Sequence, residues 1–294
     1  MKKYVRFNIN GNYLNLLDGR IQYSKNDISH ATVILSDDDI NIDYIYQLNE
    51  KVDKNLYYDW DFFYKYTDKE LDGANLFRIK ILNTIDTCGE ECGTKYDESI
   101  SCPICGAGRK QVGLLKLSGN LSFAGYDIYK TIGGEIIVTK RFQELLLKNN
   151  IQGIIFQPII INGEISLYFM QLIATVGIDI SHKTRFGIDY FDKMNIPSSN
   201  EKTINICGHN ITIPKEIYVC PNHDLLGLCL LSELFIDKES FRLHHYDFMK
   251  TMQYVGVKRG MLRPEPLYVC SKSFFEMIKR ENIYGMEFDI AHIK

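Results

Sequence analysis

Four cysteines lie close together in the sequence with the spacing of zinc ligands. Cys88 and Cys92 enclose three residues, Cys102 and Cys105 enclose two, nine residues separate the pairs, and a glycine follows each pair. Zinc binds four thiolates tetrahedrally, and a loop can bring two short cysteine turns together around it. Glycine suits the end of such a turn, because a side chain there would crowd the sulfurs. The spacing predicts a zinc ribbon with a structural ion, since four protein ligands leave no open position on the metal.

A second group of metal-binding residue types lies in the last third of the chain. It consists of Cys207, His209, Cys220 and His223. We favour the simpler interpretation, in which the cysteines are small buried residues and the histidines lie at loop ends. A metal with an open coordination position at this group would instead indicate a zinc-dependent hydrolase. A Cys220–His223 nucleophile pair has little support, because three residues of separation on a turn do not make a catalytic dyad.

An acidic run and an aromatic run stand out in the first third of the chain. The aromatic run, residues 57–66, includes Trp60, the only tryptophan. The acidic run consists of Asp37, Asp38, Asp39 and Asp43. One interpretation is structural: a solvated turn, and a strand or helix that packs on the core. The other interpretation predicts a partner face at these residues, because acidic groups beside aromatic anchors suit a basic protein partner.

Composition limits the class of protein. Of the 294 residues, 45% are apolar and 24% are charged, which is typical of folded globular proteins. The formal net charge of −3 provides no global cationic field for phosphate backbones, which argues against a general nucleic-acid binder. No apolar stretch reaches the roughly 20 residues of a membrane-spanning helix, and the N-terminus lacks the hydrophobic region of a signal peptide. We therefore expect a cytoplasmic protein whose thiols stay reduced.

Two segments separated by 132 positions resemble each other. Residues 137–158 and 269–290 are identical at seven of 22 positions. In each segment an apolar strand ends at a residue suited to cap a helix, Thr139 or Ser271. A helix with one apolar face follows, and an Asn-Ile-x-Gly turn ends it before a second strand. The pattern predicts a duplicated strand–helix–strand unit.

Together these signals predict an α+β fold with a zinc ribbon and a duplicated strand–helix–strand unit, preceded by an irregular, mostly β N-terminal region. The polar segment 197–202 is typical of a linker. The expected divisions are residues 1–84 for the N-terminal region, 85–200 for the zinc ribbon and first repeat, and 201–294 for the second repeat.

Residues 85–161 resemble a bacterial family, the double-CXXCG motif proteins. The resemblance rests on the two cysteine pairs with their glycines and on the segments Val138–Leu146 and Asn150–Pro158. The first pair departs from the family pattern, because it encloses three residues instead of two. Many members of this family are cytoplasmic immunity partners of polymorphic toxins. The resemblance therefore implies a zinc ribbon and a toxin partner, and it implies no catalytic residue.

We predict a non-enzymatic cytoplasmic protein that contains structural zinc and neutralises a bacterial toxin domain by binding it. One alternative is a zinc-ribbon adaptor associated with nucleic acid, for which Arg109 and Lys110 give slight support. The other is the zinc-dependent hydrolase that would use the cluster from Cys207 to His223.

Overall fold

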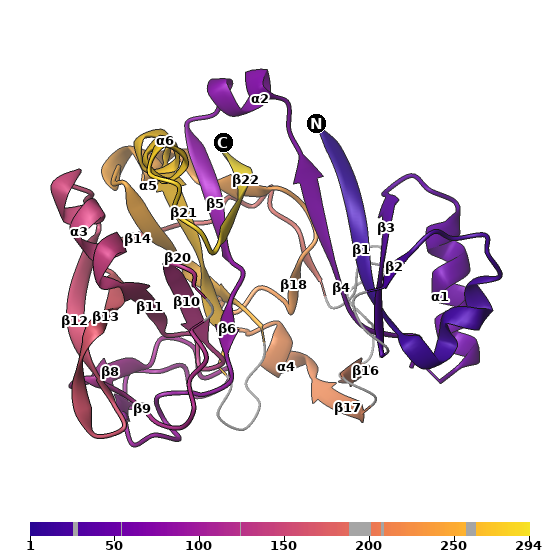
Figure 1. Cartoon of the computed structure of the whole chain (residues 1–294), viewed down its shortest axis with the longest axis horizontal. Coiled ribbons are helices and arrows are strands. Elements are labelled where there is room, and N and C mark those ends of the chain that lie inside the picture. The colour runs from indigo at the N-terminus through magenta and orange to yellow at the C-terminus, as the bar shows by residue number, and fades with distance from the viewer. Residues whose placement is uncertain (26–28, 54, 124, 188–200, 207–208, 257–262) are drawn as a thin grey trace. The chain divides into compact units, whose positions relative to one another are not determined.

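The computed structural model of the chain describes all residues except 26–28, 54, 124, 188–200, 207–208 and 257–262. The described residues form a mixed α+β protein that is richer in strands than in helices (Figure 1). Contacts divide it into two compact units, which we call unit 1 (Met1–Gly73 with Glu201–Ile213) and unit 2 (Ala74–Asn200 with Pro214–Lys294). Both strand–helix–strand segments fall in unit 2, and the divisions expected after residues 84 and 200 remain predictions. Among the described residues, no helix is both long enough and apolar enough to cross a membrane.

Unit 1 is built on an antiparallel sheet. Its elements are β1 (Lys2–Asn10), the 3-10 helix η1 (Gly11–Leu17), β2 (Ser24–Lys25), β3 (His30–Ser36), α1 (Asn41–Lys51), β4 (Tyr57–Lys65), α2 (Asp68–Gly73) and the hairpin of β16 (Glu201–Ile206) and β17 (His209–Pro214). The sheet order is β2-β3-β1-β4. Along β1 the alternate residues Val5, Phe7 and Ile9 are fully buried, so one face of the sheet forms the core.

Unit 2 contains two six-stranded sheets. The elements of its first half are β5 (Leu76–Ile81), β6 (Thr84–Ile85), β7 (Lys95–Asp97), β8 (Lys110–Val112), β9 (Leu115–Leu117), β10 (Ile128–Thr131), β11 (Ile136–Thr139), α3 (Lys140–Lys148) and β12 (Ile154–Ile161). Those of its second half are β13 (Glu164–Ala174), β14 (Gly177–Ile178), β15 (Phe186–Gly187), α4 (Lys215–Tyr218), β18 (Cys229–Leu230), β19 (Leu234–Ile236), α5 (Lys238–Leu243), β20 (Phe248–Val255), β21 (Glu265–Ser271), α6 (Lys272–Arg280) and β22 (Met286–Ile293).

The two sheets of unit 2 have the same topology. The first sheet has the order β6-β10-β11-β13-β12-β9, and the second has the order β14-β20-β21-β5-β22-β19. In both sheets the two outermost strands run parallel to their neighbours and the inner strands pair antiparallel. The registers also match: Ile128 pairs with Val138 in the first sheet, and their counterparts Phe248 and Cys270 pair in the second.

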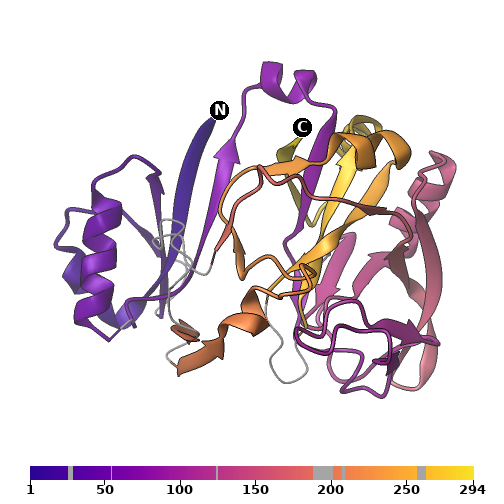
Figure 2. The same ribbon diagram turned by 180° about the vertical axis from the view of Figure 1, so that it is seen from behind.

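Each sheet takes its central strand from the other half of the unit. Strand β5 precedes all strands of the first sheet in the chain, yet it pairs with β21 and β22 in the second. Strand β13 opens the second half, yet it pairs with β11 and β12 in the first. Figures 1 and 2 show the purple ribbon of β5 beside the yellow C-terminal strands. The two sheets therefore depend on each other for their centres.

The two long helices of unit 2 begin where the sequence predicts. The side chains of Thr139 and Ser271 accept hydrogen bonds from the backbone N–H of Phe142 and Phe274, each at 3.2 Å, and so cap α3 and α6. Both phenylalanines are fully buried, and their ring centroids are 6.5 Å apart. The apolar faces of the helices thus meet near their N-termini.

Two buried or half-buried aspartates cross-link the halves in the same way. The carboxylate of Asp127 accepts hydrogen bonds from the hydroxyl of Thr139 (3.2 Å) and from the backbone N–H of Tyr284 (3.1 Å) in the other half. The carboxylate of Asp247 accepts from the hydroxyl of Ser271 (2.8 Å) and from the backbone N–H of Gln152 (3.1 Å). Each aspartate therefore connects a helix start in its own half with a helix end in the other.

Candidate metal centre

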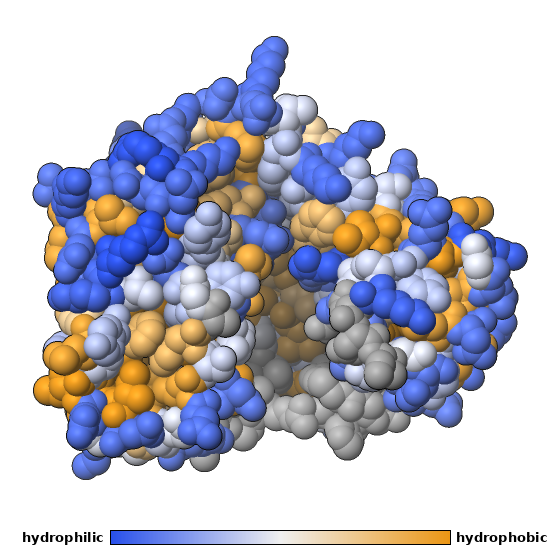
Figure 3. Space-filling model, viewed as in Figure 1, coloured by the Kyte–Doolittle hydropathy of each residue, from blue (hydrophilic) through white to orange (hydrophobic). Residues whose placement is uncertain are grey.

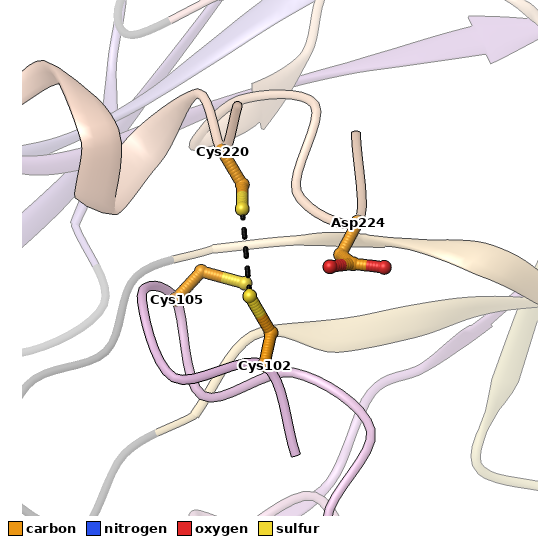
Figure 4. Close-up of side chains that lie close together, drawn as sticks. All are labelled: Cys102, Cys105, Cys220 and Asp224. Atoms are coloured by element: carbon orange, nitrogen blue, oxygen red, sulfur yellow. Dashed lines mark hydrogen bonds between the residues drawn. The ribbon is translucent and has the colours of Figure 1, made fainter. Parts of the chain in front are cut away.

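Four potential metal ligands come together inside unit 2. The ligand atoms of Cys102, Cys105, Cys220 and Asp224 all lie within 4.8 Å of one another. Figure 4 shows the three sulfurs facing one another with the Asp224 carboxylate beside them, and the sulfurs of Cys102 and Cys220 are 3.6 Å apart. Cys105 and Cys220 are buried, and the other two residues are half-buried. Residues 118 positions apart thus share one site.

Two similar turns present these ligands. The first turn, with Cys102 and Cys105, lies between the paired strands β7 and β8. The second turn, with Cys220 and Asp224, follows α4. In each turn a proline follows the cysteine that begins it, Cys102 or Cys220. The backbone N–H of Cys102 donates to the carbonyl of Ala107 at 2.8 Å, and that of Cys220 donates to the carbonyl of Leu225 at 3.0 Å, in each case five residues later.

Apolar side chains enclose the sulfurs. Cys105, Ala107, Cys220 and Leu225 form one buried cluster, against which Tyr254 packs. Burial raises the pKa of the Cys105 thiol to about 12. Burial also raises the pKa of Cys102, but hydrogen bonds from backbone N–H groups of its own turn and from the Asn222 amide outweigh that effect and lower it. The two sulfurs of one turn therefore differ in their tendency to ionise.

The donor set fits zinc. Thiolates are soft ligands that select zinc over the hard cations magnesium and calcium, and zinc also accepts a carboxylate oxygen. Zinc–sulfur bonds of about 2.3 Å in a tetrahedron place two sulfurs about 3.8 Å apart, close to the separation of Cys102 and Cys220. Three sulfurs and one oxygen would complete a tetrahedral site.

The other two predicted ligands lie outside this cluster. In the described part of the chain, Cys88 and Cys92 belong to no group of three or more close metal-binding side chains. Burial raises the pKa of the Cys88 thiol, with the nearby carboxylates of Glu91 and Glu135 adding to the shift. The Cys92 sulfur lies 3.4 Å from the Thr87 hydroxyl and 3.2 Å from the Ser118 hydroxyl. The structure thus brings together only half of the predicted four-cysteine set.

The structure also divides the second predicted group of metal-binding residues, Cys207, His209, Cys220 and His223. Cys220 contributes to the cluster, whereas His223 is exposed and does not. Cys207 and the side chain of His209 lie outside the described residues.

The predicted partner face belongs to unit 1. Asp37 and Asp38 are exposed at the connection from β3 to α1, and Asp43 is exposed in the first turn of α1. Asp39 is half-buried, and its carboxylate accepts the N–H of Asn41 at 2.8 Å. Trp60 on β4 pairs in register with the buried Phe7, so it lies on the core-facing side of the sheet and is half-buried. The acidic part of this face is therefore accessible in unit 1, and the tryptophan is accessible only in part.

Of the basic pair behind the nucleic-acid alternative, Lys110 is exposed, whereas Arg109 is engaged within unit 2. Arg109 forms ion pairs with Glu90 and with Glu98, the latter at 3.4 Å, and its guanidinium stacks 3.9 Å from the centroid of the Tyr96 ring. Only 8% of its side chain is exposed, so it contributes little to a basic surface.

Sequence reasoning considered Asp224 only as an orienting residue for a Cys220–His223 pair, and it did not connect Asp224 or Cys220 with Cys102. The available signal was the Cys-Pro dipeptide that begins both turns, at Cys102 and at Cys220. The chain matches no protein-family model and no curated protein.

Proposed function

We propose that Cys102, Cys105, Cys220 and Asp224 hold a structural zinc ion. The observation that carries this proposal is the convergence of four ligand atoms from two distant turns within 4.8 Å. Zinc at this site would cross-link the two turns, and with four protein ligands it would keep no open position for a substrate. The metal centre thus supports a role in stability and argues against the zinc-dependent hydrolase.

We propose further that unit 2 arose by duplication of one strand–helix–strand unit. The matching strand orders and registers of the two sheets support this origin, as do the paired caps at Thr139 and Ser271. The resemblance of residues 85–161 to double-CXXCG proteins remains part of the proposal, because it rests on the sequence motifs alone.

The biological role that we propose is binding to a bacterial toxin domain as its immunity protein. One support is the exposed acidic run of Asp37, Asp38 and Asp43, which would steer a basic partner. A second support is an apolar hairpin of unit 2, formed by β12 and β13, whose exposed side chains include Ile165 (60%), Leu167 (80%) and Tyr168 (74%). Figure 3 shows apolar surface gathered at the lower left, in the region of this hairpin. Exposed apolar patches of this kind are typical of protein interfaces.

Co-expression with a toxin domain encoded by a neighbouring gene tests this role. The wild-type protein should restore growth, and the purified pair should form a stable complex. The double variant Asp37→Lys with Asp38→Lys should lower the association rate about tenfold or more at low salt, with less effect at high salt. Asp86→Lys, which reverses the charge of an exposed residue in unit 2, serves as the control. Absence of protection and of a complex would refute the immunity role, and equal rates for both reversals would refute the acidic face.

A further inference from the structure

The two sheets of unit 2 carry lysines at equivalent positions. Lys130 on β10 donates its backbone N–H to the carbonyl of Asn83 at 2.9 Å, and Lys250 on β20 donates to the carbonyl of Val176 at 3.0 Å. Lys130 pairs in register with Ile136 on β11, and Lys250 pairs with the matching residue of β21, Tyr268. The two lysines therefore occupy the same place in the shared topology, and their surroundings can be compared directly.

The two lysines differ in their counter-ions. The ammonium of Lys130 forms an ion pair at 2.6 Å with Glu265, the first residue of β21. The position that matches Glu265 in the first half, 132 residues earlier, is Gly133. The ammonium of Lys250 makes no ion pair or hydrogen bond with any residue that the structure describes. Burial lowers the pKa of Lys250, as expected for an amine that has lost water and gained no carboxylate.

A pocket lies beside Lys250 and Gly133, where the first half has no carboxylate to match Glu265. It has a volume of about 180 Å³ and is lined by Lys250, Gly133, Gly134, Arg109 and Arg263 among others. At about 30 Å³ per water molecule, this is room for roughly six waters, enough for a carboxylate or phosphate group with a few attached atoms. A side chain at Gly133 could not fill the space, because its Cβ would lie 2.8 Å from the Cβ of Cys88.

The two carboxylates that line this pocket already have hydrogen-bond or ion-pair partners. Glu135 accepts hydrogen bonds from the hydroxyls of Tyr96 and Thr131 and from the N–H of Gly89 (3.2 Å). Glu265 is paired with Lys130. Among the described lining residues, the other two cations, Arg109 and Arg263, form ion pairs with Glu90 and Glu98 outside the pocket. Lys250 is therefore the lining cation without a described counter-ion, since neither Glu135 nor Glu265 forms an ion pair with it.

We propose that this pocket binds a small oxyanion, a carboxylate or phosphate group, whose charge pairs with Lys250 as Glu265 pairs with Lys130. Binding needs no reaction at the lysine, so the site is a ligand site and not a catalytic one. It is also separate from the acidic run of the proposed partner face, because all of its lining residues belong to unit 2 and the acidic run belongs to unit 1.

Protection of Lys250 from amine modification tests the proposal on the wild-type, zinc-loaded protein. Cyanate carbamylates neutral amines, and mass spectrometry gives the rate at each lysine separately. We expect saturating phosphate or acetate to slow modification of Lys250 at least fivefold relative to chloride at equal ionic strength. Lys148, exposed at the end of α3, should show no change. The phosphate and acetate arms identify which oxyanion binds, and no protection of Lys250 in either arm overturns the proposal.

A variant provides a second measurement. Lys250→Met removes no described ion pair, so the variant should fold, and the stabilisation of the protein by the protective anion in thermal melts should disappear. Lys148→Met should keep that stabilisation. An equal shift in melting temperature for wild type and Lys250→Met would contradict the assignment of the site to Lys250.

Discussion

At the scale of single residues, the choice between two ligand sets can be decided by substitution. Cys220→Ser removes a buried member of the cluster that is absent from the four-cysteine set, and Cys92→Ser removes a sulfur that lies outside the cluster. We expect Cys220→Ser to lose stoichiometric zinc and to melt at a much lower temperature, since structural zinc contributes about 10 kcal/mol or more in small domains. Cys92→Ser should retain one zinc per chain. Elemental analysis of both variants, purified without chelator, measures the number of zinc ions per chain.

The opposite pattern would restore the four-cysteine ribbon. In that case Cys92→Ser and Cys88→Ser would lose the metal, and Cys220→Ser would retain it. This pattern would exclude the cluster with Asp224 as the zinc site.

The sequence could predict half of the candidate site at this scale. Cys102 and Cys105 are recognisable because both ligands lie within one short turn, so their spacing alone indicates a shared metal. Cys220 and Asp224 reach the same place only through the folding of more than a hundred intervening residues. Local spacing carries no information about that contact, and an aspartate is a less frequent zinc ligand than cysteine or histidine.

At the scale of elements, the turn after α3 provides a test of close packing. Gly153 (φ 91°) and Gly163 (φ 88°) have nearly the same positive φ, which costs an alanine about 1–2 kcal/mol. Space around Gly163 is open, whereas a methyl group on Gly153 would collide with the carbonyl oxygen of Phe248. Gly153→Ala should therefore cost about 1–3 kcal/mol more than Gly163→Ala in denaturant unfolding. Equal costs would show that the Gly153–Phe248 contact relaxes freely.

The elements themselves were largely predictable, and their partners were not. Capping residues and apolar periodicity locate α3 and α6, because both signals are local. The strand pattern could not show that β5, placed by sequence in the N-terminal region, forms the centre of the second sheet. Strand pairing depends on contacts between residues far apart in the chain, and an apolar strand such as β5 fits the centre of either sheet.

At the scale of the whole molecule, the exchange of β5 and β13 should make unit 2 respond as one body to metal removal. The proposed zinc joins a turn of the first half to a turn of the second, and each sheet depends on a strand from the other half. Chelation should therefore raise amide hydrogen exchange in α3 and α6 together, by a similar factor, in place of loosening one half alone. Mass spectrometry of peptides covering residues 140–148 and 272–280, before and after chelator, measures the two helices in one sample. Faster exchange confined to the 102–105 and 220–224 turns, with both helices unchanged, would contradict this coupling and limit the metal to local ordering of the loops.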